Sequence, residues 1–246
     1  MLFSIITVCY NSEKTIERTI KSVLNQTESD YEYIIVDGGS TDKTLDIVMQ
    51  YENQFDGRLK YISEKDNGIY DAMNKGIAMA EGKLIGIVNS DDYYEPDAFE
   101  NMKKEYEKLD EKDRKHLVLY GIQRIVKDGK ELAREIYHHD NLDNQMISHP
   151  TCFVSKETYK DFGVFDTKYK SAADYDLMMR FYHKSDTTFV PVYDVISNFE
   201  RGGISGTGIG QKETAMIRYE YGLVPKSRIW YEGLHSFIVK IYRKIK

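Results

Sequence analysis

Two adjacent carboxylates within residues 89–92 (Asn-Ser-Asp-Asp) could bind a divalent cation. They directly follow the aliphatic run of residues 84–88, which is typical of a buried parallel strand. Open α/β sheets bind ligands at the C-terminal ends of their strands, and Mg²⁺ or Mn²⁺ prefers carboxylate oxygens and is often shared with substrate phosphates. The pattern therefore predicts a site for a metal ion and a diphosphate. The alternative is that Asp91 or Asp92 caps a helix beginning near Pro96.

Two further carboxylates follow predicted strands of the first half. Asp37 ends a strand predicted over residues 31–36, and Asp66 follows a short strand over 59–62. Parallel strands bring these ends to one edge of the sheet, where so many carboxylates repel one another unless a cation or hydrogen-bond donors neutralise them. This convergence predicts a nucleotide and metal site. Asp37 could instead shape the turn at the two glycines that follow it.

A second candidate for chemistry is Asp174, at the start of a helix predicted over residues 173–182. A carboxylate at a helix N-terminus is stabilised as the anion, which is the state that a general base needs. The same stabilisation makes it a weaker base, so a catalytic use depends on close positioning. The alternative role is an N-cap.

The order of the predicted elements positions these residues. Apolar residues repeat with strand or helix spacing, which predicts strands over 3–9, 31–36, 59–62 and 84–88 that alternate with helices over 13–24, 40–49 and 70–80. This order predicts a parallel, doubly wound sheet with right-handed crossovers. After residue 96 the pattern changes to a charged helix to 109, a charged turn over 110–115, a hairpin of 116–126 with 131–137, and strands over 151–154, 187–190 and 193–199.

The composition restricts the class of protein. The length of 246 residues predicts one large domain or one domain plus appendages, and a hydrophobic content of 41% is enough for a full core. The pI near 5.6 argues against a nucleic-acid partner. The N-terminus reads as a strand rather than a signal peptide, and no apolar run reaches the length of a membrane span. The cysteines Cys9 and Cys152 lack metal-ligand spacing, so a cytoplasmic, reduced chain is expected.

The C-terminal residues 225–246 differ in charge from the rest. They hold six Lys or Arg and one Glu, or +5, whereas the whole chain carries −6 and the remainder therefore −11. Their apolar positions 230, 234, 237, 238 and 241 have helical spacing. A basic amphipathic helix with a Trp is typical of a peripheral anchor on an anionic membrane surface. The alternative is a helix docked on the domain.

Six segments of the chain, in order, resemble those of bacterial family 2 glycosyltransferases with a GT-A fold: residues 4–11, 36–42, 64–76, 89–92, 174–177 and 202–205. The resemblance implies an α/β GT-A fold, with a Rossmann-like, doubly wound and mostly parallel central sheet, a smaller acceptor-side β/α region and C-terminal helices. The implied division is a glycosyltransferase domain over 1–210, with a nucleotide-binding half (1–96) and an acceptor-binding half (97–210), and a helical tail over 211–246.

The resemblance also implies roles for single residues. Asp174 matches the family's catalytic base, and Asp91 and Asp92 would hold Mn²⁺ or Mg²⁺, with Asp92 as the main ligand. The remaining matched positions would bind the donor nucleotide: Thr7, Val8, Tyr10, Asn11, Asp37, Gly38, Gly39, Ser40, Asp66, Asn67, Gly68, Asn89, Ser90 and Asp91. Two positions depart from the family pattern, because Asn89 replaces the first Asp of an Asp-x-Asp motif and Ala173 replaces a frequent Glu.

Three further residues have weaker signals. Lys75 could reach the nucleotide or be solvated on its helix. His149, before Pro150, could bind an acceptor hydroxyl or phosphate, or be structural. Arg201 precedes the glycine-rich residues 202–210, which could form a lid that closes over the donor, with Arg201 on the diphosphate. A plain linker to the C-terminal helices is the alternative.

The resemblance implies an inverting, metal-dependent transfer of one sugar. The donor would be a nucleoside-diphosphate sugar, most simply a UDP-sugar, and the acceptor a glycan or lipid-linked oligosaccharide of surface polysaccharide assembly. The Gln-x-x-Arg-Trp motif of processive synthases is missing. Two rival functions are a sugar nucleotidyltransferase and a non-catalytic sensor or scaffold of a glycan-assembly complex. The oligomeric state is open, and a homodimer is one option.

Overall fold

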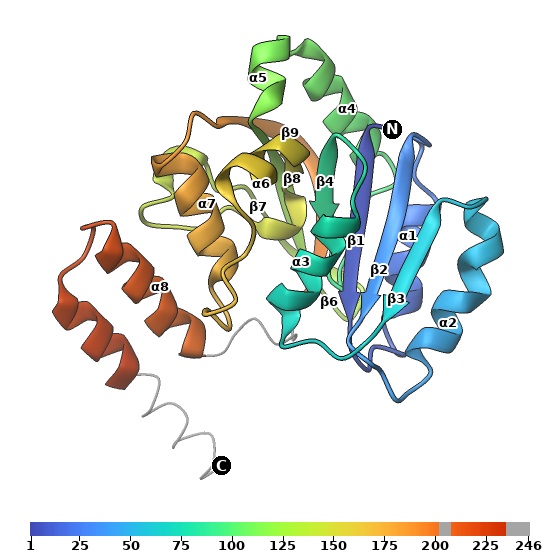
Figure 1. The fold of residues 1–246 in the computed structure, drawn as a ribbon, viewed down its shortest axis with the longest axis horizontal. Helices are drawn as coiled ribbons and strands as arrows, with labels where there is room; N and C mark the ends of the chain where they lie inside the picture. Colours follow the sequence, from blue (N-terminus) through green and yellow to red (C-terminus); the bar gives the residue numbers. More distant parts are fainter. Residues whose placement is uncertain (202–207, 235–246) are drawn as a thin grey trace.

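One mixed sheet forms the centre of the computed structural model, which describes residues 1–201 and 208–234 (Figure 1). Over these residues nine strands lie in the order β3-β2-β1-β4-β8-β6-β9-β5, with β7 paired to β6. Their bounds are Phe3–Cys9 (β1), Tyr31–Asp37 (β2), Leu59–Ser63 (β3), Leu84–Ile87 (β4), Tyr93–Tyr94 (β5), Leu117–Lys127 (β6), Lys130–Glu135 (β7), Phe153–Ser155 (β8) and Thr188–Glu200 (β9).

The sheet has two regions with different pairing. Strands β1 to β4 pair in parallel with one another, and every residue of β1 and β2 is buried, as their largely apolar sequences favour. Beyond β4, strand β8 pairs antiparallel with both β4 and β6, while β6 and β9 are parallel. The predicted doubly wound α/β fold is confirmed, and so is the hairpin of β6 and β7.

The helices cover both faces of this sheet (Figure 1). Their bounds are Ile16–Leu24 (α1), Thr44–Tyr51 (α2), Ile69–Met79 (α3), Ala98–Lys108 (α4), Glu111–Lys115 (α5), Lys156–Phe162 (α6), Ala173–His183 (α7) and Gly208–Glu220 (α8), with 3₁₀ turns at Glu52–Phe55, His139–Asn141 and His149–Thr151. Residues 226–234 are also helical. None of the helices in the described ranges is long and apolar enough to cross a membrane.

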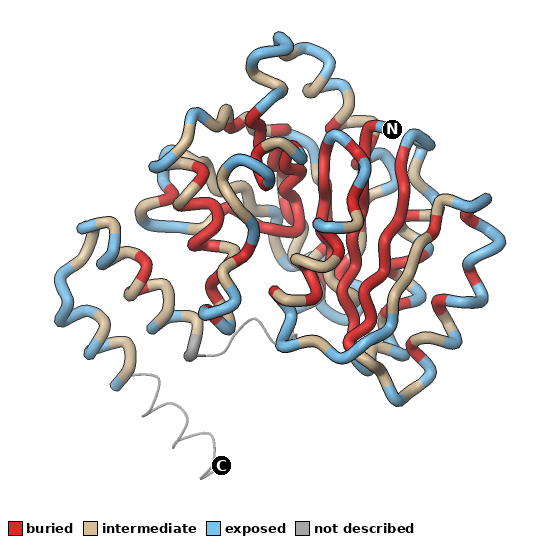
Figure 2. The backbone as a smooth tube through the Cα atoms, in the orientation of Figure 1, coloured by how far each residue is buried: buried red, intermediate tan, exposed pale blue. Residues whose placement is uncertain are grey.

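Alternate side chains of β1 pack into two apolar cores, one on each face of the sheet. Ile6 and Val8 pack with α3, α6 and α7, whereas Phe3 and Ile5 pack with α1, α2 and α4. This alternation follows from the two-residue period of a strand. Figure 2 shows the result, since the central strands are buried along their length and the exposed residues lie on the outer helices and loops. The rigid double core fixes where the strand ends lie.

Several local predictions needed correction. The first helix begins at Ile16 rather than residue 13, because the backbone of Asn11 is left-handed and Ser12 closes a turn onto Thr15. The turn expected over 110–115 contains the short helix α5, and α6 was not predicted. The two strands expected over 187–199 are the single strand β9, which bulges opposite Gly121 and Ile122.

Candidate active site

The C-terminal ends of β1 and β4 open onto a cavity of about 650 Å³, here called the strand-end cavity. Eight of the residues predicted to bind a nucleotide line it: Val8, Tyr10, Asn11, Asp66, Gly68, Asn89, Ser90 and Asp91. The sequence did not single out several polar neighbours that also line it, namely Ser12, Glu13, Lys14, Thr15 and Asp42. The topology therefore gathers residues from four separate segments into one polar cavity, as expected for the carboxyl edge of a parallel sheet.

Asp37 lies beneath this cavity rather than on its wall. Its side chain is fully buried and accepts hydrogen bonds from the Ser40 amide at 3.0 Å and the Ser63 hydroxyl at 2.6 Å. Burial, followed by the charge of Asp37, raises the pKa of the Cys9 thiol. These contacts match the turn-shaping role, and a direct contact between Asp37 and a nucleoside stays a prediction.

Asp66 instead reaches the cavity. One of its carboxylate oxygens accepts from the Gly68 amide at 2.9 Å. The other lies against Gly38, where a Cβ atom would collide with it. A side chain at position 38 would therefore displace the Asp66 carboxylate from its present position. The carboxylate is partly exposed and faces the same space as Asn89 and Asp91.

The structure separates the two carboxylates of residues 89–92. Asp91 lines the strand-end cavity, whereas Asp92 is 0% exposed and accepts from the Glu200 amide at 3.1 Å and the Asn89 side chain at 3.2 Å. Burial and the charge of Asp91 raise the pKa of Asp92 to about 7, and burial also raises the pKa of Asp91. Asp92 therefore ties the motif to β9, and Asp91 is the carboxylate that faces the strand-end cavity.

The other residues predicted to bind the donor nucleotide do not line the strand-end cavity. Thr7 is buried and accepts from the Tyr33 hydroxyl at 2.9 Å, and Lys75 is paired with Glu64 at 2.7 Å. Gly38, Gly39, Ser40 and Asn67 likewise do not line the strand-end cavity; the Ser40 hydroxyl accepts from the Asn11 amide at 2.8 Å. Thr7 lies in β1 and Lys75 in α3, whereas the other four residues lie in loops. A direct nucleotide contact by any of them stays a prediction.

A second cavity of about 360 Å³, the central cavity, adjoins the first. The two share Ile69 and Asn89 in their walls, and the central cavity also contains Asp174 and His149. The Asn89 side-chain oxygen is buried and has no hydrogen-bond partner within the described residues. A hydrogen-bond acceptor that lacks a partner at the junction of two cavities can accept a hydrogen bond from a ligand or bind a cation.

Asp174 is held from two sides. It is the second residue of α7, and one carboxylate oxygen accepts from the Tyr70 hydroxyl at 3.1 Å and from the Tyr175 amide at 2.9 Å. Burial and the charge of Asp174 raise the pKa of Tyr70, so this tyrosine stays a donor. Tyr70 lies within residues 64–76 but was not assigned a role from the sequence. The other carboxylate oxygen remains available in the central cavity.

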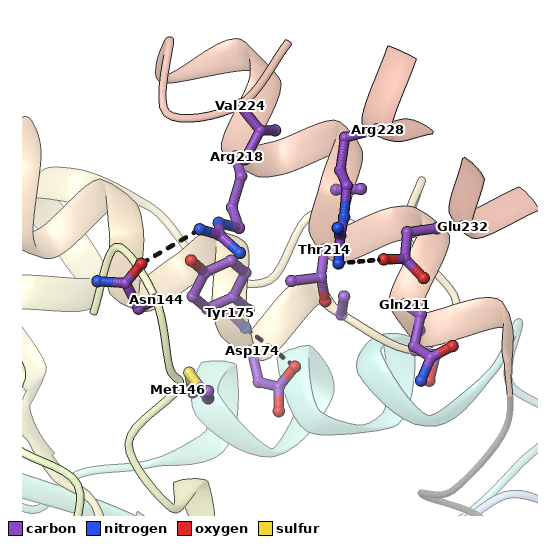
Figure 3. A pocket seen from close by; sticks show the side chains of 14 residues that line it. Asn144, Met146, Asp174, Tyr175, Gln211, Thr214, Arg218, Val224, Arg228 and Glu232 are labelled. Atoms are coloured by element: carbon purple, nitrogen blue, oxygen red, sulfur yellow. Dashed lines mark hydrogen bonds and ion pairs between the residues drawn. The ribbon is translucent and has the colours of Figure 1, made fainter. Parts of the chain in front are cut away.

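A third cavity of about 520 Å³, the α8 cavity, lies on the far side of Asp174 (Figure 3). It shares Met146, Ser171 and Asp174 with the central cavity and is closed by α8 and the helix over 226–234. Helix α8 is fastened to the chain before α7 by Glu213, whose carboxylate accepts from the amides of Lys170 at 2.9 Å, Ser171 at 2.8 Å and Ala172 at 3.1 Å. Three converging backbone N–H groups form an anion-binding nest. No sequence signal identified Glu213.

His149 and Arg201 lie in different environments. The His149 ring is buried beside Phe165, and burial lowers its pKa while Asp174 opposes that shift, so the ring is neutral. Arg201 is exposed, and its amide donates to the Val126 carbonyl at 2.8 Å. The glycine-rich lid expected after Arg201 lies mostly outside the described residues.

The residues present fit a divalent cation only with help from a ligand. The described residues contain no group of three or more His, Cys, Asp or Glu side chains arranged to hold a metal ion. Burial raises the pKa of both Asp91 and Asp92, so their surroundings disfavour the charged carboxylates, which a bound cation would stabilise. Mg²⁺ typically takes one or two carboxylates and completes its shell with water and substrate phosphates. Asp91, beside Asn89, meets that requirement.

Comparison with solved structures defines the class of fold. Residues 1–349 of S. aureus TarS in complex with UDP match with a TM-score of 0.71 at 21% identity, over 93% of this chain and 68% of that one. The mannosyltransferase PcManGT from Pyrobaculum calidifontis, in complex with GDP-Man and Mn²⁺, matches with a TM-score of 0.66 at 18% identity, over 90% and 64%. The fold is that of the GT-A glycosyltransferases.

Sequence comparison then identifies the family. The family model for glycosyl transferase family 2 matches residues 4–185, so the chain belongs to this family and carries its glycosyltransferase domain. It is 34% identical over 185 residues to chondroitin synthase of Escherichia coli, and 29% identical over 212 residues to the PGL/p-HBAD biosynthesis glycosyltransferase of Mycobacterium tuberculosis. These alignments cover 73% and 84% of this chain, but 26% of the synthase and 80% of the mycobacterial protein.

Proposed function

We propose that this protein is an inverting, metal-dependent glycosyltransferase that moves one sugar from a UDP-sugar to a hydroxyl group of a glycan or lipid-linked oligosaccharide. One observation carries this proposal. The cavity that contains Asp174 shares Asn89 with the cavity at the strand ends. A base and a nucleotide-sized polar site therefore adjoin, as transfer from a nucleotide to a hydroxyl requires. The UDP and UDP-GlcNAc complexes of the structurally similar TarS support the choice of donor.

The donor side binds and orients the nucleotide. In our proposal the strand-end cavity holds the nucleoside diphosphate between Tyr10, which is 62% exposed, and Asp66. The sugar then extends past Asn89 into the central cavity. Asp91 would hold a Mn²⁺ or Mg²⁺ ion, which supplies positive charge next to the departing diphosphate.

The acceptor side supplies the base. The hydroxyl group of the acceptor lies against one carboxylate oxygen of Asp174. The Tyr70 hydroxyl and the Tyr175 backbone amide hold the other oxygen. The hydroxyl oxygen attacks the anomeric carbon as the bond between this carbon and the diphosphate oxygen breaks, and the hydroxyl proton passes to Asp174. Attack from the face opposite the leaving group inverts the anomeric configuration.

The test is the release of UDP from a panel of UDP-sugars, with Mn²⁺ or with EDTA, and with or without an acceptor oligosaccharide. We expect Mn²⁺-dependent release that the acceptor accelerates. Binding of a UDP-sugar without any release would favour the rival sensor or scaffold function. Formation of a UDP-sugar from UTP and a sugar phosphate would favour the nucleotidyltransferase.

The location of the protein is a further part of the proposal. The helix over 226–234 exposes Trp230 to 77% and Leu234 to 61%, next to the basic Lys226 and Arg228. Exposed aromatic and basic residues suit a peripheral position on the cytoplasmic face of an anionic membrane, near surface polysaccharide assembly. The remaining residues of the predicted amphipathic tail, 235–246, lie outside the described residues. Removal of residues 225–246 should shift the protein from the membrane to the soluble fraction, and an unchanged distribution would contradict the anchor.

A further inference from the structure

The α8 cavity contains an arginine without a charged partner. Arg218 projects from α8 into this cavity and donates to the side-chain oxygen of Asn144 at 3.3 Å (Figure 3). Across the described chain it forms no ion pair with a carboxylate, and its Nε atom is buried without a hydrogen-bond partner. The other cation of the cavity, Arg228, is paired with Glu232 at 2.6 Å. Arg218 is therefore the uncompensated positive charge of this cavity.

The space continues outward from Arg218 into a second hollow. This outer hollow, of about 620 Å³, is lined by Arg218, Val224, Pro225, Ser227, Arg228 and Tyr231. Among the described residues its lining contains two arginines, of which Arg228 is paired with Glu232, and no acidic side chain. A concave surface of a single charge sign concentrates ligands of the opposite sign. Arg218 lies at the boundary of the α8 cavity and the outer hollow, where a planar guanidinium with free N–H groups favours carboxylate or phosphate.

The opposite end of the α8 cavity is negative, because it is closed by Asp174. An acceptor that carries an anionic group is repelled at that end and attracted at the Arg218 end. The two charges therefore orient such an acceptor in one direction, with a hydroxyl at Asp174 and the anion at Arg218. A volume of about 520 Å³ lies within the range of about 300–1,000 Å³ that is usual for small-molecule sites.

We infer that Arg218, supported by Arg228, forms an anion-binding acceptor subsite, which selects acceptors with a carboxylate or phosphate group near the hydroxyl to be glycosylated. The inference rests on the proposed function, because it uses Asp174 as the base that faces the acceptor hydroxyl. It adds the chemical class of the acceptor, namely an acidic glycan or a phosphate-containing polymer. It also assigns an acceptor-binding role to α8 and to the helix over 226–234, for which the sequence had indicated only a membrane-anchoring role in the latter.

The experiment compares acceptors that differ only in charge. An oligosaccharide with hexuronic acid residues and its carboxyl-reduced, neutral counterpart test the carboxylate, and a glycerol phosphate oligomer tests the phosphate. The binding of each to the full chain in the presence of UDP is measured by calorimetry, and transfer rates are measured alongside. The variant is Arg218→Gln. The matched control is Lys212→Gln, which removes one positive charge from an exposed position of the same helix.

For the unchanged protein we expect about 10- to 100-fold tighter binding of at least one anionic probe than of the neutral oligosaccharide, as one charge-assisted hydrogen-bonded pair provides. Arg218→Gln should reduce this ratio to near one, and Lys212→Gln should preserve it. The anionic probe that binds more tightly than the neutral oligosaccharide identifies the recognised group as carboxylate or phosphate. Raising the salt concentration should weaken anion binding to the unchanged protein more than to Arg218→Gln.

Equal binding of charged and neutral probes, or a charge preference that survives Arg218→Gln, would overturn the inference. UDP binding, measured separately by thermal shift, separates this outcome from failure of the proposed function. If the unchanged protein binds and releases UDP but shows no charge preference, or if the preference survives Arg218→Gln, the subsite alone is rejected. Absence of UDP binding and release would reject the proposed function, while a charge preference removed by Arg218→Gln would still support the anion site.

Discussion

The donor and acceptor sides of this site are built in different ways. The strand-end cavity is lined mainly by the loops that follow β1, β2, β3 and β4, and the fully buried strands β1 and β2 anchor two of these loops in the sheet. The α8 cavity is bounded by loops and helices, which single side chains hold together: Glu213 on the amides before α7, and Arg218 on Asn144. Because the sheet core holds the donor side and a few polar contacts hold the acceptor side, substitutions should affect them separately.

The largest effect is expected from a substitution on the acceptor side that removes the proposed general base, Asp174. Asp174→Asn keeps an oxygen for the Tyr70 hydroxyl and the Tyr175 amide but cannot take a proton. Transfer should fall by ~10²–10⁴-fold, as for loss of a general base, with UDP affinity unchanged. Steady-state kinetics measure the transfer rate, and UDP titration measures the UDP affinity. Glu220→Gln, an exposed change on α8, serves as the control. Retention of most transfer activity would refute the role of Asp174.

The next largest effect is expected from a substitution of Asp91 on the donor side. Asp91→Asn removes the charge that faces the strand-end cavity, so kcat/KM should fall by about 10²-fold or more, as for loss of a group that stabilises the leaving charge. The gain in UDP affinity on adding Mn²⁺ should also disappear. Asp92→Asn is the informative comparison because Asp92 is buried. If Asp92→Asn abolishes the Mn²⁺ effect and Asp91→Asn preserves it, Asp92 is the main ligand, as the family resemblance implied.

A smaller effect should follow from loosening α8. Glu213→Gln removes the charge that three backbone amides share, and a charge-assisted hydrogen bond contributes about 1.5–3 kcal/mol. We expect kcat to fall about 10-fold and the thermal midpoint to decrease, with UDP affinity unchanged. Glu220→Gln is the matched control, since its partner, the Tyr169 hydroxyl, is 3.4 Å away. A fall in UDP affinity comparable to the fall in kcat would show that the two sides are coupled.

The smallest effect concerns stability against pH. Burial lowers the pKa of His149, so the folded state keeps this ring neutral where the unfolded chain already binds a proton. Below an unfolded pKa of about 6.5 the unfolded state gains protons, and stability is lost as pH falls. In His149→Gln this contribution is absent. The difference in unfolding free energy between the two proteins, from denaturant titrations, should shrink by at most roughly 2 kcal/mol between pH 7.5 and 5. A constant difference would contradict it.

The sequence by itself determined the donor half. Aliphatic runs that end in carboxylates predict parallel strands, and parallel strands must bring Asp66 and Asp91 to one edge. This argument works because periodicity is local and the chirality of the crossovers restricts the topology. The chain order of the family segments also identified Asp174 as a candidate.

Only the tertiary structure decided which carboxylates face the strand-end cavity. Asp37 and Asp92 follow strands as Asp91 does, yet both are buried against neighbouring segments. The acceptor side was equally unpredictable. Tyr70 meets Asp174 from 104 residues away, and Glu213 joins α8 to residues 41 to 43 positions earlier. Such contacts depend on how helices pack, which no local period in the sequence encodes.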